Sequence, residues 1–194
     1  MRDHGCGLTL SAAVHPPGYL LLKRLLHLFV DILLLRAGPQ DVPASPALLM
    51  LAMLASVATS LLLTLESFSG GDAALRVTVE LGLSALLLVA LLAFHGHRAR
   101  FVQSFTAICG TGAILALVAW PLFGIVLARP TEDSLAVLAL LLLWLLFGWS
   151  IVVVGHILRH ALEIGWFRGL LLALAYALLI AGLGEWALPS PEAR

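Results

Sequence analysis

Charged side chains are scarce in this chain. They make up 11% of its 194 residues, whereas an ordinary soluble domain carries about 25%. Hydrophobic residues make up 61%, so a water-facing surface cannot be built and a soluble globular domain is excluded. The 11 basic and 11 acidic residues balance to a net charge of zero, which argues against the basic patch that a nucleic-acid partner requires.

Cysteines and catalytic motifs are also lacking. The two cysteines, Cys6 and Cys109, have no partner at the spacing of a metal site, so we expect free thiols. There is no His-Glu-x-x-His motif, no phosphate-binding glycine loop and no pair of intramembrane aspartates. The run from Gly148 to Ile151 lacks the second glycine of a nucleophile elbow around Ser150. We therefore expect neither an enzyme nor a cofactor.

What the chain has instead is five long apolar runs joined by short polar loops. Crossing a hydrocarbon core of about 30 Å takes about 20 mostly apolar residues, and each run is long enough. The runs cover approximately residues 47–65, 73–94, 101–128, 134–158 and 164–186. We predict an all-α polytopic membrane helical bundle of five transmembrane helices within residues 42–188, followed by a short tail, 189–194. Pro121 in the third run should kink its helix or mark its entry into the interface.

The N-terminal segment, residues 1–41, contains an amphipathic stretch at about residues 18–36. Lys23, His27 and Asp31 recur at helical spacing on one face, and leucines cover most of the remainder. We predict a helix that lies in the membrane interface and precedes the five spans. A cleaved signal peptide and a sixth span are the alternatives. Three prolines and a glycine within residues 37–46 should end this helix in a stiff turn.

Basic residues are unevenly divided between the two sides that five spans define. Eight fall on the first side, namely Arg2, Lys23, Arg24, Arg36, Arg98, Arg100, Arg159 and Arg168, and three on the second, namely Arg76, Arg129 and Arg194. Lysine and arginine accumulate on the cytoplasmic side of membrane proteins. We therefore predict a protein of the bacterial inner membrane with a cytoplasmic N-terminus and a periplasmic C-terminus.

Small residues recur every four positions along the fifth run. They are Gly165, Gly169, Ala173, Ala177 and Ala181. Such a ridge lets another helix backbone approach closely, which favours helix association in a bilayer. We interpret it as a packing face within the bundle, and a homodimer seam is the alternative.

Glu80 is the strongest candidate for a polar site within a span, because ionisable groups there are costly and are functional hypotheses by default. Arg76 lies four residues earlier, on the same helical face. Either the two charges neutralise each other near the outer interface, or the two side chains form a polar site that faces a cavity. In the second case Glu80, Gln103 and Ser104 would line a path near Pro121 in a small transporter or channel subunit.

Four histidines form a further candidate site on the predicted cytoplasmic side. His156 and His160 are one helical turn apart, and His95 and His97 end the neighbouring second span at similar depth. The spacing of four residues can present two imidazoles to one metal, which makes a haem or metal protein a second alternative. Interfacial placement without a metal is the expectation, because no cysteine and no carboxylate beyond Glu163 supports ligation.

The outline of the chain, together with several short motifs, resembles the Yip-type membrane proteins, the family named for Ypt/Rab interaction, and especially their prokaryotic relatives. The motifs are Leu34-Leu35-Arg36-Ala37-Gly38-Pro39 before the first span, the basic turn and start of the third span at residues 98–105, Gly110-Thr111-Gly112, and Trp120-Pro121-Leu122. The resemblance implies a helical bundle that is not an enzyme. Eukaryotic relatives serve vesicle traffic and bind Rab-type GTPases, but this chain lacks their long N-terminal region and Asp-Leu-Tyr-Gly-Pro-like segment, so no GTPase-binding residue is carried over.

The resulting functional expectation is an integral inner-membrane protein of scaffold or accessory type. It would bind the lipid bilayer and a membrane-protein partner or a second copy of itself. The transporter or channel subunit and the haem or metal protein remain the alternatives.

Overall fold

The computed structural model describes residues 17–130 and 132–187, and this part of the chain is helical throughout, without a strand. The helices are α1 (Pro17–Leu33), α2 (Pro46–Thr64), α3 (Gly70–Phe94), α4 (Phe101–Ala128), α5 (Ser134–Leu162) and α6 (Trp166–Ala187), with short 3₁₀ turns η1 (Pro39–Asp41) and η2 (Arg98–Arg100). Helices α2 to α6 are each long and apolar enough to cross a membrane. The predicted five-span helical bundle is confirmed. Cys6 and the predicted tail, residues 189–194, lie outside the described residues.

Local signals in the sequence set the helix boundaries. Ser45 and Ser69 each accept a hydrogen bond from a backbone N–H in the first turn of α2 and α3, and Asp133 does the same for Leu135 in α5. Helix α5 continues four residues beyond the predicted end at 158 and stops at Glu163, which adopts a left-handed conformation with φ of 57°. Helix α4 runs without interruption through Pro121.

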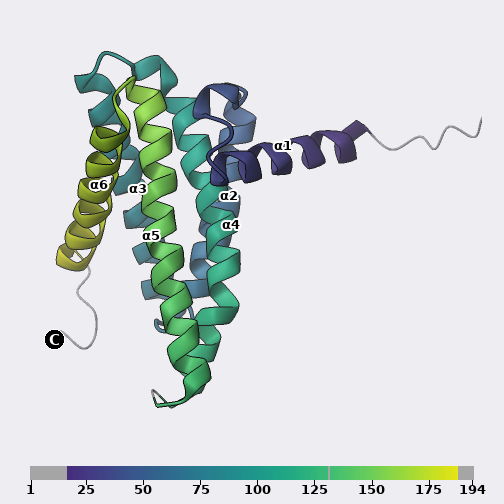
Figure 1. Cartoon of the computed structure of the whole chain (residues 1–194), viewed down its shortest axis with the longest axis vertical. Helices are drawn as coiled ribbons and strands as arrows, with labels where there is room; N and C mark the ends of the chain where they lie inside the picture. Colours follow the sequence, from purple (N-terminus) through teal and green to yellow (C-terminus); the bar gives the residue numbers. More distant parts are fainter. Residues whose placement is uncertain (1–16, 131, 188–194) are drawn as a thin grey trace, which may run out of the picture.

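The five long helices lie alongside one another, and α1 runs roughly at right angles to them and extends outward from the side of the bundle (Figure 1). Helix α4 is central, with its most extensive contacts to α2 and α5, while α6 packs on α5 and α3. One end of the bundle gathers α1, both 3₁₀ turns and the α5–α6 turn. We call this the arginine-rich end, because it carries Arg36, Arg98, Arg100, Arg159 and Arg168 in addition to Lys23 and Arg24 of α1.

Helix α1 is amphipathic as predicted, and its C-terminal half is part of the core. Phe29 and Ile32 are buried with Val42 and Ile157, whereas Lys23 and His27 on the polar face are exposed. The Phe29 ring packs directly over Gly110 of α4, where a Cβ atom would collide with it. The carbonyl of Leu33 accepts a hydrogen bond of 3.2 Å from the indole of Trp149. These contacts fix α1 to the bundle, and its placement in a membrane interface stays a prediction.

The small-residue ridge of α6 contacts α5 over only part of its length. A Cβ atom at Gly169 would lie 2.8 Å from the carbonyl oxygen of Gly155, so both glycines are needed for the two backbones to approach this closely. Ala173 is also buried, but Gly165 and Ala181 are exposed. In Figure 1 the two helices are closest near their connecting turn and separate toward the end of α6.

Candidate functional site

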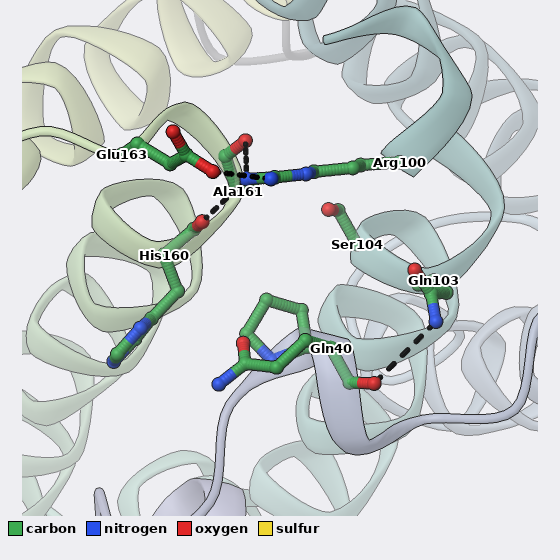
Figure 2. A pocket seen from close by; sticks show the side chains of 8 residues that line it. Gln40, Arg100, Gln103, Ser104, His160, Ala161 and Glu163 are labelled. Atoms are coloured by element: carbon green, nitrogen blue, oxygen red, sulfur yellow. Dashed lines mark hydrogen bonds and ion pairs between the residues drawn. The ribbon is translucent and has the colours of Figure 1, made fainter.

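A polar pocket of about 280 Å³ opens at the arginine-rich end, and we call it the Arg100 pocket (Figure 2). Three segments that are distant in the sequence build it: turn η1, the start of α4 and the end of α5. Its lining residues are Pro39, Gln40, Arg100, Gln103, Ser104, His160, Ala161 and Glu163. The predicted candidates Gln103, Ser104 and His160 are thus brought together.

Arg100 ties the start of α4 to the end of α5. Its Nη1 donates to the carbonyl oxygens of His160 and Ala161, both at 3.2 Å, and its Nη2 forms an ion pair with Glu163. The last carbonyls of a helix have no partner within the helix, and they carry the negative end of its dipole. Arg100 therefore caps the C-terminus of α5. Its hydrogen bond and positive charge lower the pKa of the Glu163 carboxyl below its ordinary value.

The hydroxyl of Ser104 is a buried polar group of this pocket that has no hydrogen-bond partner among the described residues. The whole of Ser104 is fully buried. The side-chain amide of Gln103 beside it already has a hydrogen-bond partner, because its Nε2 donates to the carbonyl oxygen of Val42 at 2.9 Å. In Figure 2 the imidazole of His160 points away from Ser104. The pocket thus offers a buried hydroxyl without an adjacent base.

The four candidate histidines are not gathered around one point. The rings of His156 and His160 lie edge to face with centroids 4.6 Å apart, whereas Nδ1 of His95 bonds to the carbonyl oxygen of Leu91 and Nε2 of His97 lies 3.8 Å from Glu163. Nε2 of His156 lies 2.9 Å from the carbonyl oxygen of Ala37. A carbonyl only accepts hydrogen bonds, so this nitrogen carries the proton and is not a metal ligand. Within residues 17–130 and 132–187 no group of three or more His, Cys, Asp or Glu side chains could hold a metal ion.

Glu80 lies in a different place from Gln103 and Ser104. Nε of Arg76 is 3.4 Å from Oε1 of Glu80, and Nη2 of Arg76 forms an ion pair with Glu185 of α6. Glu80 also lines a second pocket of about 290 Å³, which we call the Glu80 pocket. Its other lining residues are Ser150, Ile151, Val154, Ala173, Tyr176, Ala177, Ile180 and Ala181. The single path predicted along Glu80, Gln103 and Ser104 is therefore divided between two separate pockets, and Pro121 lines neither of them.

Several lining residues were not singled out as site residues in the sequence. Arg100 entered only the charge tally and the Yip-like motif at residues 98–105, and nothing pointed to Gln40 or Tyr176. Glu185, which pairs with Arg76, was not singled out either. Glu163 could have been found from its position directly after the basic last turn of α5, where an acidic side chain can bind arginines of a neighbouring turn.

Compared with models of known protein families, with curated proteins and with solved structures, the chain matches none. Its resemblance to the Yip-type proteins consequently stays a prediction.

Proposed function

We propose that this chain is a scaffold or accessory protein of the bacterial inner membrane, which binds negatively charged lipid or protein partners at its arginine-rich end and does not catalyse a reaction. Membership of the Yip-type family is part of this proposal. The five apolar helices support a multi-pass membrane protein, and the two ends of the bundle differ in charge.

The charge difference is the observation that carries the proposal. Among the described residues, the arginine-rich end and α1 hold seven basic side chains against Asp31, Asp41 and Glu163. The opposite end holds Arg76 and Arg129 against five acidic side chains, Glu66, Asp72, Glu132, Asp133 and Glu185. Basic residues mark the cytoplasmic side, and the surface of the cytoplasmic leaflet is negative. This supports a cytoplasmic N-terminus and a periplasmic C-terminus.

Exposed arginines lie at the same end of the bundle as the Arg100 pocket, where they can meet the charge of a partner. Arg36, Arg98 and Arg168 are exposed, whereas Arg100 is engaged by two carbonyls and Glu163. A basic residue near an anionic membrane surface contributes about 1 kcal/mol to binding. The absence of a base next to Ser104 in the pocket favours binding over catalysis.

The test compares lipid retention by two variants in nanodiscs of mixed zwitterionic and anionic phospholipids. We expect native mass spectrometry to show anionic lipids bound to the wild-type chain, and about 10-fold or greater loss of them in the combined variant Arg36→Gln, Arg98→Gln, Arg168→Gln. Arg129→Gln at the opposite end is the control and should retain them. Two results together would contradict the proposal. They are equal retention of anionic lipids by the two variants, and no cross-link to a partner protein from a site-specific cross-linker placed at Gly165, at the same end.

Transport is a second candidate function, favoured by the position of Glu80 on a pocket within the bundle. It predicts that Glu80→Gln changes the flux of a cationic solute into liposomes containing the purified protein. Identical flux for wild type and variant would remove this candidate and leave the scaffold function unaffected.

A further inference from the structure

The Glu80 pocket has a composition that differs from that of the Arg100 pocket. It lies between α3, α5 and α6, and Glu80 is the charged residue of its lining. Glu80 is ten residues into α3, or about 15 Å along the axis at 1.5 Å per residue. The pocket is therefore well inside a span, where the walls are supplied by aliphatic side chains of α5 and α6.

The pocket exists because the small-residue ridge of α6 leaves α5 partway along. Near the connecting turn, Gly155 and Gly169 bring the two backbones into contact. Two turns further, Ala177 and Ala181 line the pocket and lack the bulk to fill it. The same ridge that packs one part of the interface thus leaves space in the other.

The carboxylate of Glu80 is only partly matched by its arginine. Arg76 is shared between Glu80 and Glu185, and its Nε lies 3.4 Å from Oε1 of Glu80. The Arg76 side chain is 12% exposed, whereas that of Glu80 is 44% exposed. The carboxylate therefore presents itself to the pocket, and a carboxylate in apolar surroundings is stabilised by an added positive charge.

The hydroxyl groups of the lining already donate their protons to main-chain carbonyls. Ser150 uses its proton in a 2.7 Å bond to the carbonyl oxygen of Phe147, and Tyr176 uses its proton in a 2.9 Å bond to the carbonyl oxygen of Ser84. The Tyr176 oxygen already accepts the proton of the Ser84 hydroxyl, whereas the oxygens of Ser150 and Glu80 are left as acceptors on the pocket. A ligand that donates hydrogen bonds fits this lining, and an anion does not.

We propose that the Glu80 pocket binds a lipophilic organic ammonium ion, with its charged nitrogen against Glu80 and its apolar body against Ile151, Val154 and Ile180. The site is separate from the arginine-rich end. It rests on the second candidate function only in sharing Glu80, and it names the class of ligand that this candidate leaves open.

The test is equilibrium binding of 1-aminoadamantane, a compact hydrocarbon cage with one ammonium group, measured by isothermal titration calorimetry. The protein is held in nanodiscs of zwitterionic lipid, and the heat of empty nanodiscs is subtracted. We expect saturable binding with one site per chain. The uncharged 1-adamantanol, which has the same body, should bind at least 10-fold more weakly.

Two variants, each with its own control, test separately whether the charge of Glu80 and the open volume of the pocket are needed for binding. Glu80→Gln and Ala177→Leu should each weaken binding of 1-aminoadamantane by at least 10-fold, the first by removing the charge and the second by filling the pocket. Their controls are Glu66→Gln, an exposed carboxylate after α2 that does not line the pocket, and Ala175→Leu, on the exposed side of α6, and both should bind as wild type does.

Wild-type heat that equals that of empty nanodiscs, or undiminished binding by Glu80→Gln, would overturn the proposal. Circular dichroism of each variant shows whether it is folded, and Ala177→Leu gives a second measurement if Glu80→Gln is not. Binding of 1-aminoadamantane without solute flux would remove the transport candidate alone. If neither Glu80→Gln nor Ala177→Leu weakened binding, the proposal for this pocket would fail, and the function proposed for the arginine-rich end would not be affected.

Discussion

Two regions of the bundle each contain an arginine that forms an ion pair with a glutamate distant in the sequence, but the two arginines have different roles. Arg100 holds two main-chain carbonyls in addition to Glu163, so it closes the end of α5. Arg76 is paired with the side chains of Glu80 and Glu185, and it lies beside a pocket inside the bundle. One arginine completes a helix end, and the other compensates the negative charge of two glutamates.

The packing between α5 and α6 also differs from one end of their interface to the other. At the arginine-rich end, Gly155 meets Gly169 and the core side chains Ile157 and Leu158 are fully buried. Toward the other end the helices separate around the Glu80 pocket. A closely packed end that fixes the helices and an open end that leaves space for a ligand are thus parts of one helix pair.

The largest expected effect comes from breaking the closed end at Arg100. Arg100→Gln removes the ion pair and leaves two carbonyls without their charged donor, which should lower the free energy of unfolding by about 3 kcal/mol. The measurement is unfolding in detergent micelles followed by circular dichroism. Arg98→Gln, in the same turn but exposed, should change stability by less than about 0.5 kcal/mol. Equal effects of the two changes would show that Arg100 does not cap α5.

A smaller effect is expected from adding one methyl group to the ridge. Gly169→Ala places a Cβ atom 2.8 Å from the Gly155 carbonyl oxygen and should cost about 1 to 2 kcal/mol of stability. The matched change Gly165→Ala has no atom within 4 Å of the new group and should be neutral or slightly stabilising. If both glycines tolerate alanine equally in the same unfolding assay, the close approach of the two helices is refuted.

The smallest effect is a dependence of stability on pH through Glu163. Its pKa is lowered in the folded chain, chiefly by the hydrogen bond from Arg100. A carboxyl of this kind stabilises the fold fully above its ordinary pKa, and the stabilisation is lost as the pH falls through the lowered value. We expect the midpoint of thermal unfolding to be constant near neutral pH and to decline below about pH 4.

The variant Glu163→Gln isolates this contribution. Its decline at acid pH should be shallower than that of wild type, and Asp133, whose pKa is lowered chiefly by the hydrogen bond from the Leu135 backbone N–H, should account for part of the remainder. Parallel curves for the variant and wild type would show that Glu163 does not contribute.

The bundle was predictable from the sequence because five apolar runs of sufficient length leave few other folds. The residues at which its helices end were less predictable. The predicted end of α5 at residue 158 was too early, because the apolar run stops before the polar Arg159 and His160, whereas the carbonyls of His160 and Ala161 are bonded by Arg100 of turn η2. A tertiary contact, which no local pattern reports, extends the helix.

The pockets were harder to predict for the same reason. Arg100 and Glu163 are 63 residues apart, as are Gln103 and Gln40. The pairing of Arg76 with Glu80 was accessible from their spacing of four residues, but the partner Glu185 is 109 residues away from Arg76. Spacing reveals neighbours on one helix, and it does not reveal which helices meet.

The orientation of the two ends in the membrane tests the central claim most directly. Single cysteines at Gly71, in the first turn of α3, and at Gly165, in the α5–α6 turn, can be labelled with a membrane-impermeant thiol reagent in intact spheroplasts after Cys6 and Cys109 are changed to serine. Both glycines are exposed, with no atom within 4 Å of an added Cβ. The account predicts that Gly71→Cys is labelled at once and that Gly165→Cys is labelled only after permeabilisation. Labelling of Gly165→Cys in intact spheroplasts, with Gly71→Cys protected, would contradict a cytoplasmic arginine-rich end.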